Sequence, residues 1–209
     1  MRTERFTFPG HAGDELAARL DLPSGPHLAT AVFAHCFTCS KDIMATRRIS
    51  ARLTTMGYAV LRFDFTGLGH SDGEFENTNF TSNVEDLYSA VASLTTQDMT
   101  PTLLIGHSLG GAAVLKATAN LPDIKAVVTI GAPADPAHVV HNFGTSLDEI
   151  EKNGKATVSL AGRTFTISHD FVQDISGTKL NDSLTNLQAA LLVLHSPIDQ
   201  TVGIKNASQ

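Results

Sequence analysis

Short apolar runs alternate with amphipathic segments over most of the chain. Runs of strand length that are apolar throughout predict buried strands at residues 28–34, 59–63, 102–105, 125–130 and 189–194. Residues 42–56 carry apolar side chains at helical spacing and stop at Gly57. Residues 84–94 share an apolar helical face behind a capping-box pattern formed by Ser82 and Glu85. The repeated order of strand and helix predicts a mostly parallel central sheet with helices on both faces.

Two segments depart from this alternation. Near the N-terminus, residues 5–8 and 16–20 predict an antiparallel pair joined by a turn at 9–14. Between Pro133 and Leu187 no buried strand is visible. Polar helical pieces are predicted there instead, at 147–152 and 171–175. A hairpin is predicted between them, with strands at 156–160 and 164–168 and a turn at 161–163. An insertion this long at this point of an α/β sheet predicts a small cap at about 134–187, and an elaborated surface loop is the alternative.

The pentapeptide Gly106-His107-Ser108-Leu109-Gly110 joins the strand at 102–105 to a run of small, helix-compatible residues. A G-x-S-x-G turn between a buried strand and a helix is typical of the nucleophile of serine hydrolases. Gly106 and Gly110 leave free the space that side chains would fill around the strained serine. We therefore predict Ser108 as the nucleophile, with His107 as a supporting residue inside the turn. The alternative role of Ser108 is a helix N-cap.

A second turn supplies the other part of the expected site. His35, Cys36 and Phe37 directly follow the strand at 28–34, where hydrolases of this kind place their second oxyanion donor. The backbone N–H groups of Phe37 and Leu109 are the predicted pair of donors. His35 is expected to brace this loop, which is nearly the same role as that of a packed histidine at the end of a strand.

The acid of a catalytic triad is predicted after the last visible strand. Asp199 stands where the chain order Ser, Asp, His places the carboxylate, and its alternative role is the N-cap of a helix near Thr201. That order requires a histidine after Asp199, and residues 200–209 contain none. His35, His70 and His195 lie at strand ends, where they suit loop bracing better than a substitute base. Either the sequence is a piece of a longer hydrolase, or it has lost the base and binds rather than cleaves.

Cys36 and Cys39 form a C-x-x-C pair, which occurs in redox motifs and as half of a zinc site. The sequence shows no second pair of ligands at matching spacing, so no metal is expected and inert loop cysteines are favoured over a redox role. The loop at 64–73 is rich in glycine, but its spacing does not match a phosphate-binding loop. A tight structural loop that packs against the serine turn explains it better.

Composition narrows the class of protein further. A chain of 209 residues with 42% hydrophobic content fits one domain, residues 1–209. The formal net charge is −6 and no basic run occurs, which argues against nucleic acid as a partner. No apolar stretch is long enough to span a membrane, and the first residues show no secretory signal, so a cytoplasmic location is expected.

Three longer strings carry a resemblance to a known family. Residues 35–42 (HCFTCSKD), 62–69 (RFDFTGLG) and 195–203 (HSPIDQTVG) resemble the bacterial α/β-hydrolases that are often joined to an osmotically inducible protein C-like domain. The resemblance implies an α/β-hydrolase fold in which the last strand and the closing helix are absent from this chain.

It also implies a function. Ser108 would be the nucleophile and Asp199 the acid in the hydrolysis of an ester, thioester or amide of small to medium size. The histidine would lie beyond residue 209. No cofactor is needed, the partner is a small acyl substrate, and a longer parent would carry the C-terminal domain. A non-catalytic binding module on the same fold and a thiol-redox role of Cys36 and Cys39 are the alternatives.

Overall fold

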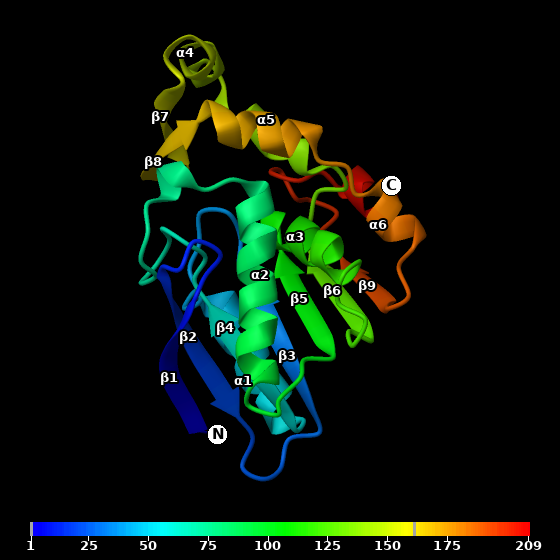
Figure 1. The fold of residues 1–209 in the computed structure, drawn as a ribbon. Helices are drawn as coiled ribbons and strands as arrows, with labels where there is room; N and C mark the ends of the chain where they lie inside the picture. Colours follow the sequence, from blue (N-terminus) through cyan, green and yellow to red (C-terminus); the bar gives the residue numbers. More distant parts are fainter. Residues whose placement is uncertain (1, 161) are drawn as a thin grey trace.

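The computed structural model describes residues 2–160 and 162–209, and a seven-stranded sheet forms its centre (Figure 1). The strands lie in the order β1-β2-β4-β3-β5-β6-β9. Their bounds are β1 Arg2–Pro9, β2 Glu15–Leu22, β3 Ala29–Ala34, β4 Tyr58–Phe63, β5 Leu103–His107, β6 Ala126–Ile130 and β9 Ala190–Leu194. β1 and β2 run antiparallel to their neighbours, and the remaining pairs are parallel. The predicted strands and the mostly parallel sheet are confirmed.

Helices cover both faces of the sheet because its central strands are buried on both sides. Helix α1 (Met44–Thr55) lies over one face, where Ile49 and Leu53 pack against Phe33 and its neighbours. Helices α2 (Phe80–Thr95) and α3 (Leu109–Thr118) lie over the opposite face, against Val32 and Leu61 (Figure 1). Successive residues of β3 therefore enter different cores, as the pleat of a strand requires.

The start of α2 corrects one prediction. The capping box is formed by Asn79 and Ser82, whereas the sequence pattern had placed it at Ser82 and Glu85. The Asn79 side chain accepts a hydrogen bond from the Ser82 N–H at 2.8 Å, and the Ser82 hydroxyl accepts one from the Asn79 N–H at 2.9 Å. The helix begins earlier because Phe80, which is fully buried, extends the apolar face by one helical turn ahead of the run at 84–94 that was used for the prediction.

The segment between β6 and β9, called the cap segment here, lies above the carboxyl ends of the parallel strands (Figure 1). It forms the predicted hairpin and helices, although Ala161 of the predicted turn lies outside the described residues. In chain order its elements are η2 Pro136–Phe143, α4 Ser146–Asn153, β7 Lys155–Leu160, β8 Arg163–Ser168, α5 His169–Gly177 and α6 Asn181–Thr185. The two short 3₁₀ segments outside it are η1 Phe75–Asn77 and η3 Ile204–Ser208.

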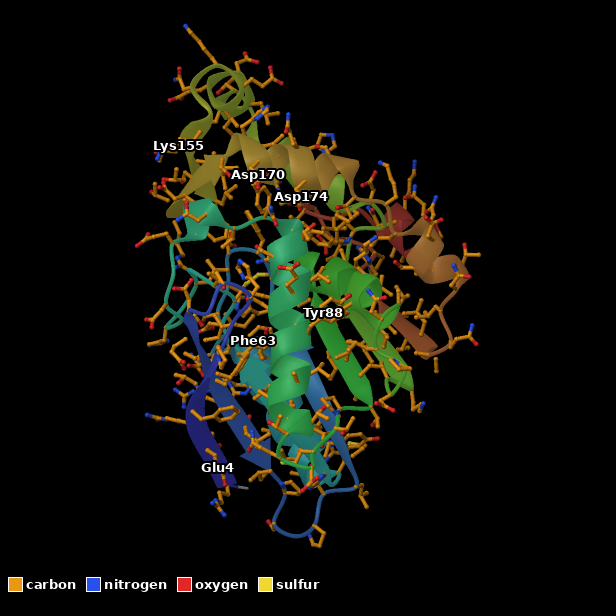
Figure 2. The ribbon with its side chains drawn as sticks, in the orientation of Figure 1. Glu4, Phe63, Tyr88, Lys155, Asp170 and Asp174 are labelled. Atoms are coloured by element: carbon orange, nitrogen blue, oxygen red, sulfur yellow. A yellow bond between two sulfur atoms is a disulfide. The ribbon has the colours of Figure 1, made fainter. Side chains whose placement is uncertain are left out.

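Two carboxylates of α5 tie the cap segment to the N-terminus of α2 (Figure 2). Asp174 accepts hydrogen bonds from the Thr81 N–H at 2.8 Å and the Thr81 hydroxyl at 2.6 Å. Asp170 accepts one from the Asn79 side-chain amide at 2.8 Å. The first turn of α2 carries no acidic residue of its own, so these carboxylates supply the negative charge that a helix N-terminus favours.

Replacing Asp174 tests this tie. We expect Asp174→Ala to lower the free energy of unfolding by about 0.5–2 kcal/mol, the usual cost of losing a capping oxygen. Amide hydrogen exchange should also accelerate at the start of α2 and along α5. Glu151→Gln, which removes an exposed charge from α4 of the same segment, is the control and should change neither quantity. Equal exchange rates in the Asp174 variant and the parent would contradict the tie.

Candidate active site

Ser108 occupies a strained turn between β5 and α3. Its backbone has φ 53° and ψ −126°, a conformation that few residues other than glycine adopt. The Ser108 N–H donates to the Ile130 carbonyl of β6 at 2.8 Å, which anchors the turn to the next strand. A Cβ atom at Gly106 would lie 2.3 Å from the Gly110 carbonyl oxygen, and one at Gly110 would lie 2.4 Å from that of His35. Both flanking positions therefore admit glycine alone without a shift of the backbone.

A cavity of about 530 Å³ opens in front of Ser108. Asp199 and His107 line it together with Ser108, so the fold brings the predicted nucleophile and acid to one cavity. Its other walls come from the loop after β3, from the cap segment and from the loop after β9, at Cys36, Phe37, Thr38, Gly131, Val139, Asn142, Ser159, Leu160, Thr201 and Val202. The cavity therefore lies between the carboxyl edge of the sheet and the cap segment.

The two predicted oxyanion donors retain free N–H groups. Among residues 2–160 and 162–209, neither the Phe37 N–H nor the Leu109 N–H has a hydrogen-bond acceptor in the protein. Leu109 is the first residue of α3, whose opening N–H groups have no partner within the helix. The positive end of the helix dipole adds to the attraction for an anion at this point.

Asp199 uses its two oxygens differently. Oδ1 accepts hydrogen bonds from the N–H groups of Thr201 and Val202, both at 2.9 Å. Oδ2 lies 3.9 Å from His195 Nε2 and faces Gly131. The hydrogen bond from the Val202 N–H, aided by that from Thr201, holds the pKa of Asp199 below its usual range despite partial burial. A carboxylate that stays ionised and keeps one oxygen free has the form that a triad acid requires.

The turn capped by Asp199 differs from the expected one. A helix was predicted near Thr201, but the next helical segment is η3, which begins at Ile204. Asp199 therefore caps the turn at 199–202 rather than a helix, because its Oδ1 bonds to N–H groups two and three residues later.

The histidines near the site act as braces in this structure. His35 is buried, donates from Nδ1 to the Cys36 carbonyl at 2.8 Å, and meets the Phe65 ring edge-on at 5.1 Å. His195 donates from Nε2 to the Val202 carbonyl at 2.6 Å. Burial lowers the pKa of His35, and it also lowers that of His107 against the opposing influence of Asp199. Among the residues that the structure describes, no histidine is hydrogen-bonded to Ser108.

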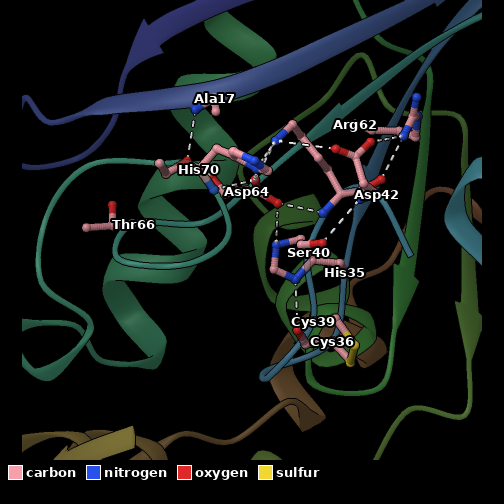
Figure 3. Close-up of polar contacts among 12 residues, drawn as sticks. Ala17, His35, Cys36, Cys39, Ser40, Asp42, Arg62, Asp64, Thr66 and His70 are labelled. Atoms are coloured by element: carbon pink, nitrogen blue, oxygen red, sulfur yellow. Dashed lines mark hydrogen bonds and ion pairs between the residues drawn. A yellow bond between two sulfur atoms is a disulfide. The ribbon is translucent and has the colours of Figure 1, made fainter. Parts of the chain in front are cut away.

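A buried ion pair holds the far end of the loop that carries Phe37, and it was not predicted from the sequence. Lys41 donates from both its backbone N–H and Nζ to the carboxylate of Asp64, and both residues are almost completely buried (Figure 3). The Asp64 carboxylate also accepts from the His70 N–H at 2.9 Å. As predicted, the loop at 64–73 packs beside the serine turn. Phe65 and Leu68 pack beside the start of α3 around a small void.

Arg62 of β4 extends this network to Asp21 of the neighbouring strand β2. Its Nη1 donates to the Lys41 carbonyl at 2.7 Å, and its Nε donates to Asp21 at 2.7 Å. Asp21 also accepts from the hydroxyls of Ser50 and Thr3. Burial alone would raise the pKa of Asp21, but the hydrogen bonds from Arg62, Ser50 and Thr3 outweigh it and hold the pKa below its usual range. The network fixes Lys41 from two sides, and with it the loop at 35–41.

Aromatic packing holds the middle of the same loop. The ring of Phe37 lies 5.1–6.4 Å, centroid to centroid, from four other phenylalanine rings, at Phe75, Phe143, Phe165 and Phe171. Three of these four belong to the cap segment. Phe165 belongs to the predicted hairpin and Phe171 to a predicted polar helical piece, but the sequence did not indicate that both pack against Phe37.

Cys36 and Cys39, which were expected to be inert thiols, form a disulfide (Figure 3). The Cys39 N–H donates to the Cys36 carbonyl at 3.0 Å, which closes a turn around Phe37 and Thr38. This turn brings the two Cα atoms to 5.2 Å, within the span that a disulfide bridges. The disulfide therefore encloses the residue predicted to donate to the oxyanion.

Comparison with known proteins identifies the family. The family described as serine aminopeptidase, S33 matches residues 26–166. This chain belongs to that family. It is 49% identical to the esterase domain of a Rhodothermus marinus protein, with a TM-score of 0.78, covering all of this chain and 82% of that one. The esterase Est1E of Butyrivibrio proteoclasticus with ferulic acid bound shares the fold at a TM-score of 0.82 and 21% identity, over 96% of this chain and 82% of that one.

Curated relatives include the human mitochondrial palmitoyl-protein thioesterase ABHD10, which is 26% identical over 155 residues and 71% of this chain. The chain spans about half the length of the curated relatives it matches first, 49% in the human case. These matches and the sheet confirm the α/β-hydrolase fold and place the chain in a serine hydrolase family. Within the described residues, no helix has the length and apolar character needed to span a membrane.

The acid dependence of stability tests the network around Asp21. Because the folded pKa of Asp21 is depressed, its contribution is present at neutral pH and is lost as the pH falls through the folded value. Asp21→Asn should lower the free energy of unfolding by about 3–5 kcal/mol at pH 7, since it leaves Arg62 buried without its partner. Urea titrations should show this difference shrink below pH 4.

The control for this measurement is Glu4→Gln, which removes a carboxylate from the exposed Arg2–Glu4 pair at the sheet edge. An exposed pair contributes little to stability, so this variant should have the same free energy of unfolding as the parent at pH 7 and at pH 3. A difference for Asp21→Asn that stays constant between pH 7 and pH 3 would show that the charge of Asp21 is not what stabilises the network.

Proposed function

We propose that this protein is a serine hydrolase that cleaves esters or thioesters of small to medium acyl groups through an acyl-serine intermediate. The observation that carries the proposal is the position of Ser108. It occupies a strained turn and lines one cavity with an ionised carboxylate, Asp199. The free N–H groups of Phe37 and Leu109 lie on the two segments that meet at this turn.

In the proposed reaction, Ser108 Oγ attacks the acyl carbon while a base takes the hydroxyl proton. The carbonyl oxygen becomes negative and accepts hydrogen bonds from the Phe37 and Leu109 N–H groups. The same proton then passes to the departing oxygen or sulfur as the acyl bond breaks. Water, deprotonated by the base, then attacks the acyl carbon. The bond to Ser108 Oγ breaks, the base returns the proton to Oγ, and the acyl group leaves as a carboxylic acid. Asp199 would hold the base in the correct tautomer and stabilise its protonated form.

We infer that the base is a histidine outside these 209 residues. The chain order Ser, Asp, His of this fold supports that inference. Strand β9 supports it too, because Leu191, Leu192, Val193 and Leu194 are all 40–52% exposed, which leaves room for a following strand. The solved esterase domain from Rhodothermus marinus is longer than the part this chain covers. On this inference, the 209-residue chain alone hydrolyses its substrate slowly.

The cavity favours esters and thioesters over peptides with a free amino terminus. An aminopeptidase needs an anionic group to receive the substrate ammonium. Among the described lining residues Asp199 is the only carboxylate, and its Oδ1 is already engaged. Val139, Leu160 and Val202 offer apolar surface to an acyl chain instead. The names of the relatives, an esterase and a palmitoyl-protein thioesterase, support the same choice.

A ligand-binding module without catalysis is the second candidate. The observation that favours it is that no histidine is hydrogen-bonded to Ser108 within the described part of the chain. A cytoplasmic location, a thiol-redox role of Cys36 and Cys39, and an osmotically inducible protein C-like domain in a longer parent stay predictions.

Labelling with a fluorophosphonate tests the nucleophile. Ser108 Oγ should displace fluoride from phosphorus, and mass spectrometry should locate the adduct on Ser108. Ser108→Ala should abolish the label. Ser159→Ala, which removes another hydroxyl from the same cavity, should retain it. An unchanged adduct yield in the Ser108 variant would remove this residue from the mechanism.

The rate of the same labelling separates the two candidates. General base catalysis is worth about 10²–10⁴-fold, so a chain extended beyond Gln209 to include the histidine should label faster by about that factor. Equal rates for the two chains would favour the binding module.

A further inference from the structure

The Cys36–Cys39 turn lies beside His107, which belongs to a different element of the fold. One ligand atom of each of the three residues, the two Sγ atoms and a ring nitrogen of His107, lie within 4.8 Å of one another. The sequence shows only the two cysteines as a pair because His107 is far from them along the chain. The parallel pairing of β3 with β5 brings the ends of these strands together.

His107 has an unused coordinating atom. Its Nδ1 is buried and has no hydrogen-bond partner among the described residues. A buried polar atom without a partner costs free energy, and such an atom in a native fold calls for an explanation. Strand β5, which ends at His107, is paired with β3 on one side and with β6 on the other.

We propose that the reduced form of this protein binds one thiophilic divalent cation of the zinc class through Cys36 Sγ, Cys39 Sγ and a ring nitrogen of His107. Thiolate and imidazole ligands together are the set that zinc prefers. Tetrahedral coordination at usual bond lengths separates such ligand atoms by roughly 3.5–3.8 Å. Atoms that already lie within 4.8 Å reach this spacing by side-chain rotation.

The charges of the proposed site balance. Two thiolates and one divalent cation sum to zero, so the half-buried position carries no net charge that its surroundings must compensate. Cys36 and His107 line the same cavity as Ser108. Three protein ligands would leave the fourth position of a tetrahedral site open to water or another small ligand.

Binding requires the dithiol form of Cys36 and Cys39, so the disulfide must first be reduced. A water-soluble phosphine gives two electrons to the Cys36–Cys39 disulfide and becomes a phosphine oxide, with oxygen and two protons supplied by water. The two thiols then lose their protons as the cation binds. The disulfide and the metal site are therefore alternative states of one loop, and Phe37 lies in that loop in both.

Metal titration of the intact chain tests the proposal. The chain is reduced with the phosphine, freed of reductant under nitrogen, and titrated with Zn²⁺ against a colorimetric chelator and separately with Co²⁺. We expect one Zn²⁺ per chain and a Co²⁺ spectrum with a thiolate charge-transfer band and intense tetrahedral bands. The disulfide form should bind at least tenfold more weakly. Because neither readout requires hydrolysis, failure of the proposed function would leave this result intact.

Variants assign the ligands. Cys39→Ser and His107→Gln should each lower Zn²⁺ affinity at least tenfold, since losing even a group that orients a ligand has that effect. His141→Gln, which alters an exposed histidine of the cap segment, should retain the parent affinity. Thermal unfolding checks that each variant folds, and His107→Asn replaces His107→Gln if the latter does not.

Three results would overturn the proposal. One is equal Zn²⁺ affinity in the reduced and disulfide forms. Another is unchanged affinity in Cys39→Ser or in the folded His107 variant. The third is a Co²⁺ spectrum with only the weak bands of octahedral oxygen coordination.

Discussion

The candidate site depends on how closely the start of α3 approaches the end of β3. Gly110 lies against the carbonyl oxygens of Ala34 and His35, where even a methyl group would be 2.4–2.6 Å from them. This contact sets the separation between the Leu109 N–H at the start of α3 and the Phe37 N–H in the loop after β3. A side chain at position 110 would drive these two segments apart. The distance between these two N–H groups is therefore set by the packing of the backbone at Gly110.

The loop after β3 is fixed at three points, each by a different kind of interaction. His35 donates to the Cys36 carbonyl at the start of the loop. Phe37 is embedded among phenylalanine rings that come largely from the cap segment. Lys41 is held at the end of the loop by the buried carboxylate of Asp64. Since α5 is in turn tied to α2, the loop after β3, the cap segment and the helix layer form one connected unit.

The sheet and the serine turn were predictable from the sequence because their signals are local. A buried strand shows as a short apolar run, and the serine turn requires glycines at fixed spacing around Ser108. Asp199 followed from chain order, and it lines the same cavity as Ser108. The start of α2 was misplaced by one turn because Phe80, buried ahead of the predicted face, was left out of the helical pattern.

The remaining features of the site could not be predicted, because each joins residues that only the fold brings together. Lys41 and Asp64 stand after different strands, and neither shows in the sequence that it is buried. His107 was visible inside the serine turn, but its proximity to the two cysteines depends on the pairing of β3 with β5. Such contacts become visible only when strand order and register are known.

We propose that the Phe37 and Leu109 N–H groups receive the negative oxygen that forms at a group attached to Ser108. A crystal structure of the chain with a phosphonate bonded to Ser108 Oγ tests this directly. We expect one phosphoryl oxygen to accept hydrogen bonds from both N–H groups at about 2.7–3.1 Å. A phosphoryl oxygen directed away from both groups would contradict it.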